Sequence, residues 1–93
     1  MRVDLQDGFD QDHVELYVNG VKRIEAGGVT TRRQLGLALS TEIEVPAGPL
    51  EIDVRVSTRQ LSKTTSVDTP NIGISIRNGA LEIITSGKRF GYA

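Results

Sequence analysis

The chain has 93 residues, of which 38% are hydrophobic and 25% charged, and its 11 basic and 12 acidic side chains leave a formal net charge of −1. A chain of this length can bury roughly 60–65% of its unfolded surface around one core, so we expect a single folded domain over residues 1–93 rather than a disordered chain. The near-zero charge gives no field that favours nucleic acid or an anionic membrane, and the lack of cysteine and the single histidine exclude disulfides, thiolate nucleophiles and multi-histidine metal sites.

The dominant sequence pattern is an alternation of apolar and polar residues. On an extended chain this alternation leaves one face apolar, so it predicts half-buried β-strands. In chain order it covers residues 2–5, 14–18, 42–45, 50–56 and 72–77. With the shorter segments between them we count about eight short strands, and we expect an all-β fold: an antiparallel β-sandwich of immunoglobulin-like or jelly-roll-like type.

The Asn19-Gly20 pair lies between two alternating segments and predicts a hairpin, because both residues tolerate the positive φ angles of a tight turn. A two-residue loop would place Leu16 opposite Arg23 and would mix the apolar and polar faces. We therefore prefer a three-residue loop with a bulge at Gly20, which pairs Val14 with Ile24.

Polar or proline-containing segments separate the strands. Residues 27–34 and 57–69 are rich in Gly, Thr, Ser, Arg and Lys, and we expect loops or irregular sheet edges there. Residues 33–39 could form one helical turn, but Gly36 argues against a full helix. A further hairpin is expected at residues 46–49, where two prolines bracket the turn.

The second Asn-Gly pair, Asn78-Gly79, gives the clearest hairpin of the sequence. A two-residue loop there brings the apolar residues of both flanking segments onto one face. It pairs Arg77 with Ala80, Ile76 with Leu81 and Ile74 with Ile83. The tail that follows, residues 87–93, either adds a last strand or reaches a neighbouring subunit, and the sequence leaves both alternatives open.

An acidic turn between the first two strands is a candidate metal site. Asp7, Asp10 and Asp12 lie close together beside Gly8, and Ca²⁺ takes six to eight oxygen ligands from flexible loops of this kind. His13 could join them as a ligand or titrate near neutrality. The alternative is a solvated turn, because Asp and Gly are also ordinary turn residues and the twelve-residue EF-hand pattern is absent.

A basic loop forms a candidate anion or partner site. Thr31, Arg32 and Arg33 combine a hydroxyl with two guanidinium groups, whose planar fork matches a phosphate, sulfate or carboxylate. Arg59 and Lys63 would lie near them if both loops leave the same end of the sandwich. The alternative is an exposed polar loop that keeps an edge strand soluble.

Three segments resemble known proteins: DGFDQDHVELYVNG at residues 7–20, GVTTR at 28–32 and VPAGP at 45–49. Together they resemble small bacterial β-sandwich proteins of uncharacterised function, and this resemblance implies a fold but no activity. The first segment is also similar to the opening of bacterial repeat and carbohydrate-associated β domains. Carbohydrate-binding relatives usually carry aromatic platforms, whereas this chain has only two Phe and two Tyr.

These observations favour a non-enzymatic binding or interaction module that contacts a partner through loops at one end or through strand edges. The alternative is a Ca²⁺-linked, small-anion-binding or carbohydrate-binding domain. An enzyme ranks last, because carboxylates are the only candidate acids and bases and the sequence does not allow any pair of them to be placed at the separation that glycosidases use.

We expect a protein partner or self-association, and neither nucleic acid nor a membrane as partner. We expect no cofactor, with Ca²⁺ as the one candidate. The N-terminal segment is charged from Arg2 onward and has no apolar run of signal-peptide length, and no segment approaches the ~18 consecutive apolar residues of a membrane helix. A cytoplasmic location is therefore the expectation.

Overall fold

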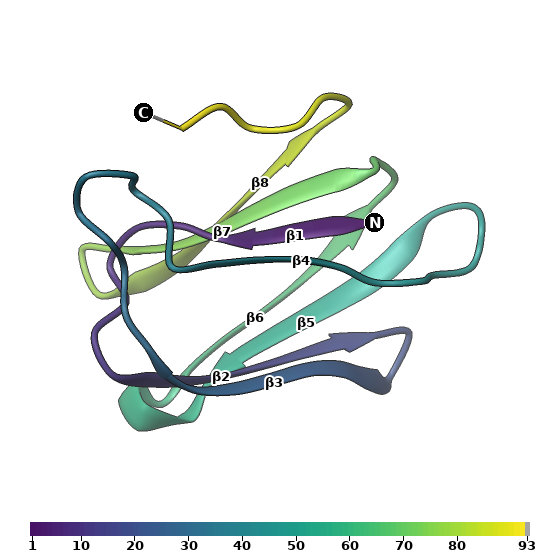
Figure 1. The fold of residues 1–93 in the computed structure, drawn as a ribbon. Coiled ribbons are helices and arrows are strands. Elements are labelled where there is room, and N and C mark those ends of the chain that lie inside the picture. Colours follow the sequence, from purple (N-terminus) through teal and green to yellow (C-terminus); the bar gives the residue numbers. More distant parts are fainter. Residues whose placement is uncertain (93) are drawn as a thin grey trace.

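Eight β-strands carry the fold in a computed structural model, which describes residues 1–92 (Figure 1). A single short 3₁₀ turn, η1 (Ser57–Arg59), is the one helical element of these residues, and it is far too short to cross a membrane. The prediction of an all-β chain with about eight strands is confirmed. The strands are β1 (Arg2–Leu5), β2 (Asp12–Val18), β3 (Val21–Val29), β4 (Leu39–Glu42), β5 (Leu50–Val56), β6 (Leu61–Val67), β7 (Asn71–Arg77) and β8 (Ala80–Ser86).

The strands form two four-stranded sheets that lie one above the other in Figure 1. We call the sheet with the order β4-β1-β7-β8 sheet A and the sheet with the order β3-β2-β5-β6 sheet B. The prediction of wholly antiparallel sheets is wrong at one place, because β1 pairs with β7 in parallel. The chain reverses direction with each strand, so these two odd-numbered strands run the same way once they become neighbours.

The core lies between the sheets and is filled by the alternating apolar residues. In β2 and β5 every second residue is buried, as the predicted period of two requires. Phe9, 3% exposed, closes the core at the end where β1 leads into β2. The fully buried side chains include Leu5, Leu16, Ile52, Val54, Ile72 and Ile74.

The hairpin predicted at Asn78-Gly79 is confirmed in every pair: Arg77 with Ala80, Ile76 with Leu81, and Ile74 with Ile83. Asn78 and Gly79 have φ angles of 53° and 74°, the positive values that a type I′ turn needs. Sequence information sufficed here because the turn and its two strands are local.

The prediction of a three-residue loop with a bulge at Gly20 is wrong. The turn has two residues, since Val18 pairs with Val21, and the extra residue is Arg23 within β3. This bulge lets Leu16 pair with Ile24, so the apolar faces still match. The sequence indicated correctly that a bulge was necessary but placed it in the turn.

The predictions around the two prolines also need correction. The strand expected at residues 42–45 is wrong in its bounds, because β4 spans Leu39–Glu42 and residues 43–45 form no strand, and residues 46–49 do not close a hairpin. They lie in a crossover from sheet A to sheet B, because β4 pairs with β1 whereas β5 pairs with β2 and β6. Pro46 and Pro49 lack the N–H groups that a hairpin ladder would use.

The polar segments are more regular than predicted. Seven of the residues in the expected loop 57–69 form β6, which pairs with β5 along its whole length, and the first residues of the expected loop 27–34 belong to β3. Ser and Thr suit an exposed edge strand as well as a loop, so composition alone could not separate the two. The single turn expected at residues 33–39 is present, with the Leu35 and Gly36 amides donating to the Arg32 carbonyl.

Candidate functional site

Four loops gather at one end of the sandwich, because odd-numbered strands run toward that end and even-numbered strands leave it (Figure 1). These loops are residues 6–11, 30–38, 57–60 and 78–79, and we call this end the loop end. Both charged segments singled out in the sequence reach it. The loop end is therefore the place where their residues can meet.

The acidic loop is held against β7. The carbonyl of Asp7 accepts a 2.8 Å hydrogen bond from the Ile76 amide, and the Asp7 amide donates to Ser75 Oγ at 3.2 Å. Gly8 follows with a φ of +89°, and a Cβ there would collide with the carbonyl oxygen of Ile76. Only glycine satisfies both conditions, so the loop conformation is fixed by this close approach.

Asp12 is the best-satisfied carboxylate of the loop end, and its side chain is 2% exposed. It accepts hydrogen bonds from the Thr58 hydroxyl at 2.7 Å, the Arg59 Nε at 3.0 Å and the Asp10 amide at 2.9 Å. Burial by itself raises the pKa of this carboxyl, but the hydrogen bonds from Arg59, Asp10 and Thr58 outweigh it and hold the pKa below its ordinary value. Asp12 therefore joins β2 to η1 as a charged structural group.

The other two aspartates of the calcium prediction are placed differently. Asp7 forms a 3.0 Å ion pair with Arg77, whereas Asp10 is exposed and forms no ion pair within residues 1–92. In that part of the chain no three His, Asp or Glu side chains are grouped so that they could hold a metal ion. Calcium binding stays a prediction, and it would require Arg59 and Arg77 to release their carboxylates.

Thr31 connects the basic loop to the acidic one. Its hydroxyl donates to the Gln6 carbonyl at 2.6 Å and accepts from the Phe9 amide at 3.1 Å, and its own amide donates to the Phe9 carbonyl at 3.0 Å. These three bonds use Thr31 as a structural group. Thr31 therefore fixes the neighbouring arginines relative to the acidic loop.

Arg33 lines a polar hollow of about 450 Å³ at the loop end, together with Asp7, Gly8, Phe9, Asp10, Thr30 and Thr31. Arg32 starts the turn of residues 32–37 through its main chain. Neither arginine forms an ion pair with any residue of the described chain. The hollow thus combines one uncompensated cation with one uncompensated carboxylate, that of Asp10.

The structure separates Arg59 and Lys63, which the sequence analysis grouped with Arg32 and Arg33. Arg59 reaches the loop end, but it is committed to Asp12 and to the Gly8 carbonyl, to which its NH2 group donates at 2.9 Å. Lys63 lies in β6 opposite Val54 and does not line the hollow. Of the predicted anion site, Thr31 and Arg33 line this hollow, and Arg32 lines a separate hollow of about 280 Å³ beside Gly27 and Leu39.

A second hollow, of about 310 Å³, opens at the opposite end of the sandwich. Its lining is mostly apolar and contains one charged side chain, that of Asp68. Few groups there could orient a polar ligand. The other lining residues are Met1, Val45, Pro46, Gly48, Leu50, Val67, Thr69 and Pro70.

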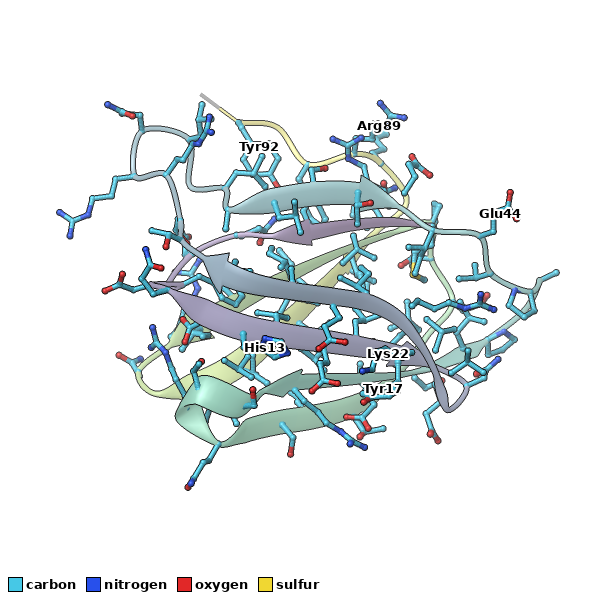
Figure 2. All side chains as sticks on the ribbon, turned by 60° about the horizontal axis from the view of Figure 1, so that its bottom comes forward. His13, Tyr17, Lys22, Glu44, Arg89 and Tyr92 are labelled. Carbon is cyan, nitrogen blue, oxygen red and sulfur yellow. The ribbon has the colours of Figure 1, made fainter. Side chains whose placement is uncertain are left out.

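A buried polar cluster on the outer face of sheet A was not predicted from the sequence. Asp4 is fully buried there, and it accepts hydrogen bonds from Ser40 Oγ at 2.6 Å and from the Tyr92 hydroxyl at 2.7 Å. Gln6 donates to the same hydroxyl at 2.9 Å. Residues 87–92 form no strand; they cross over sheet A, where Figure 2 shows Tyr92 and Arg89. Ala93, the last residue of the predicted tail, lies outside the described residues.

The outer face of sheet B carries a network of charged side chains around Tyr17 (Figure 2). Lys22 bridges Glu15 and Glu25 at 3.0 and 2.9 Å, and His13 Nε2 lies 3.0 Å from Glu25. Hydrogen bonds from Lys22 lower the pKa of both glutamates. The Tyr17 ring is covered by a guanidinium, that of Arg55, whose carbon lies 4.6 Å from the ring centroid.

Comparison with known proteins adds no relative. No protein-family model, curated protein or solved structure matches this chain. The geometry of the chain itself therefore carries the functional argument.

Proposed function

We propose that this protein is a non-enzymatic binding module whose loop end contacts an anionic group on a partner protein. One observation carries the proposal: Arg33 lines the polar hollow and has no ion-pair partner within residues 1–92, whereas Asp7 and Asp12 are each paired with an arginine. A guanidinium presents a planar fork that matches a carboxylate or phosphate. The hollow thus offers a cation where a partner's anion can bind.

The frame around Arg33 supports this proposal. Thr31, two residues before Arg33, makes three hydrogen bonds to the acidic loop, and Arg32 anchors the turn that follows. Because the main chain around Arg33 is already held in place, ligand binding has to order the side chain but not the loop, so more of the interaction energy remains as affinity. Asp10, on the same hollow, would disfavour a purely anionic ligand and favours a partner with mixed charge.

Two observations bear on the alternatives. Carbohydrate binding usually needs an open aromatic face, but the Tyr17 ring already stacks on Arg55, so a sugar at that ring would have to displace the guanidinium. For an enzyme, the candidate acids and bases are carboxylates, and of the two that line the hollow Asp7 is already paired with Arg77. Both facts favour a binding module.

The finer fold type stays a prediction. The two packed sheets support an immunoglobulin-like or jelly-roll-like sandwich at the level of layers. Constant-type immunoglobulin domains place their first, second, fourth and fifth strands in one sheet. Here β1 shares its sheet with β4, β7 and β8, so that particular strand order does not support the type.

An NMR titration of the isotope-labelled full chain tests the proposed function. The probes are a hexapeptide of alternating glutamate and lysine and, separately, inorganic phosphate, which distinguish a mixed-charge peptide from a free anion. We expect the peptide to shift the amide signals of residues 8–10 and 30–33, with a response that weakens as salt is added. Arg33→Ala should reduce the peptide affinity about fivefold or more, since it removes a charge-assisted contact.

Arg23→Ala is the matched control, because Arg23 is an exposed arginine of the β3 bulge without an ion pair in the described chain. It should leave the titration unchanged. Shifts spread evenly over the surface, or an equal loss of affinity in both variants, would contradict the proposal.

A further inference from the structure

The sandwich has four edge strands, and an exposed edge is a template for pairing with another strand. They are β4 and β8 in sheet A and β3 and β6 in sheet B. Three of them carry features that discourage pairing. β3 is interrupted by the bulge at Arg23, β4 has only four residues, and β6 has Lys63 at an inward-facing position opposite the buried Val54.

β8 carries none of these features. Its seven residues, ALEIITS, pair with β7 in unbroken register, and they include no proline, no glycine and one charge, Glu82. Ile84 is 41% exposed, one of three large hydrophobic side chains exposed among residues 1–92. A regular, apolar strand of high β-propensity at a sheet edge is the kind of edge that associates.

The hydrogen bonds of β7 show which groups of β8 are unused. Ile74 and Ile76 bond toward β1 and its following loop, since the Ile74 carbonyl accepts from Gln6 and the Ile76 amide donates to Asp7. In an antiparallel ladder alternate residues bond to opposite sides, so Gly73, Ser75 and Arg77 face β8 and bond to their register partners Ile84, Glu82 and Ala80. The main-chain groups of Leu81, Ile83 and Thr85 therefore point outward from the sheet.

We propose that β8 is the contact edge of a two-fold dimer, in which the β8 strands of two copies of this chain pair antiparallel and join their A sheets. The register with Ile83 on the two-fold axis uses all three outward-pointing residues, because Leu81 then faces Thr85 of the second copy. Moving the axis to Glu82 would set two like charges opposite each other and lose main-chain bonds. The second copy is thus a partner whose strand fits this edge without an opposed charge.

The size of the contact sets its strength. A contact made along one strand of seven residues falls at the low end of specific interfaces, below about 1,200 Å². We therefore expect a dimer with a dissociation constant in the micromolar range, which exchanges with monomer. The inference goes beyond the proposed function, since Arg33 and the hollow lie outside β8.

Analytical ultracentrifugation of the full chain over a range of concentrations tests the dimer. The wild type should shift from monomer to dimer as concentration rises. Thr85→Pro removes an outward amide that has no acceptor among residues 1–92, and it should raise the dissociation constant at least about tenfold. Circular dichroism confirms that the variant is folded.

Thr64→Pro is the matched control on the other edge. The main chain of Glu51 bonds to Asn19, so the odd-numbered residues of β5 bond to β2. The even-numbered residues of β5, such as Val54, therefore bond to β6, where their partners are odd-numbered residues such as Lys63. Thr64 therefore also points an unused amide outward. This variant should dimerise like the wild type. Dimerisation that survives Thr85→Pro, a monomer at every concentration, or open-ended oligomers would each overturn the proposal.

The register has its own test at the exposed Ile84, which would face Glu82 of the second copy. Ile84→Asp sets like charges opposite each other, and Ile84→Lys sets opposite charges, so the first variant should have a dissociation constant about tenfold above the second. Equal values would overturn the register centred on Ile83. Arg33→Ala should leave dimerisation unchanged, so failure of the dimer and failure of loop-end binding are read separately.

Discussion

Tyr92 and Asp4, 88 residues apart in the chain, are joined by a 2.7 Å hydrogen bond in which the phenol donates to the buried carboxylate. The Gln6 amide donates to the same phenol oxygen, and Ser40 donates to the other oxygen of Asp4. The tail is thereby fastened to β1, and a buried carboxylate has donors on both oxygens. The arrangement makes the tail part of the folded domain.

Tyr92→Phe should destabilise the fold. The variant keeps the ring but leaves Asp4 Oδ2 without its donor, and an unsatisfied buried acceptor costs about 1–3 kcal/mol. For a domain of this size that corresponds to a melting temperature lower by about 4–8 °C for each kcal/mol, measured by calorimetry. Tyr17→Phe is the control, since the Tyr17 hydroxyl bonds to Glu15 on the surface; an equal loss in both variants would contradict the role of the Asp4 contact.

Alkaline pH should weaken the same contact. Burial and the hydrogen bond to Asp4 raise the pKa of Tyr92 from 10.0 to about 12. As pH rises, the unfolded state therefore loses the phenolic proton before the folded state does. The free energy of unfolding is unaffected below pH ~10 and falls as pH rises toward 12. The expected loss is about 1 kcal/mol once solvent screening is allowed for. Urea unfolding at several pH values measures this loss.

In Tyr92→Phe the alkaline loss of stability should become smaller. The pKa of Tyr17 is also raised, by its hydrogen bond to Glu15, so the Tyr17→Phe variant separates the two contributions. An alkaline profile that depends on Tyr17 alone would show that the tail contact does not titrate as expected.

The contrast between two features shows what the sequence could predict. The Asn78-Gly79 hairpin was predictable pair by pair, because the turn fixes the register of two adjacent strands. The neighbours of β1 were not, since β7 lies some 70 residues further along the chain and any strand with an apolar face could fill that place. The alternation of apolar and polar residues indicates which residues face the core, but it does not indicate which strands are neighbours.

The candidate site shows the same division. Charge and turn composition drew attention to Asp12 and Arg33, but they could not show that Arg59, 47 residues away, neutralises Asp12. The Asp4 cluster gave no local signal, because an aspartate at an alternating polar position normally faces solvent. Only the path of the tail over sheet A makes that position buried.

Acid should release the contact between Asp12 and η1. Because the pKa of Asp12 is lowered in the folded state, its contribution to stability is present above the ordinary value of 3.8 and is lost as pH falls through the folded value. Asp12→Asn should destabilise the domain at neutral pH by about 1–3 kcal/mol, since Arg59 and Thr58 lose a charged acceptor, and should flatten the acid limb of the stability profile. Asp10→Asn, at an exposed carboxylate without an ion pair in the described chain, is the control and should change neither.

Gly8→Ala should be the most damaging single methyl addition in the acidic loop. The residue has a φ of +89°, and a Cβ would meet the Ile76 carbonyl, main-chain atoms that cannot move aside without breaking the contact between the loop and β7. Gly79→Ala is the matched control, because Gly79 has a similar φ of +74° but open space around it, so it carries only the conformational cost of ~1 kcal/mol. Urea unfolding of both variants isolates the steric part, and we expect Gly8→Ala to lose at least about 2 kcal/mol more. If the two losses were equal, the acidic loop would have to be free to move away from β7, and Arg33 would then have no fixed frame on which to meet a partner.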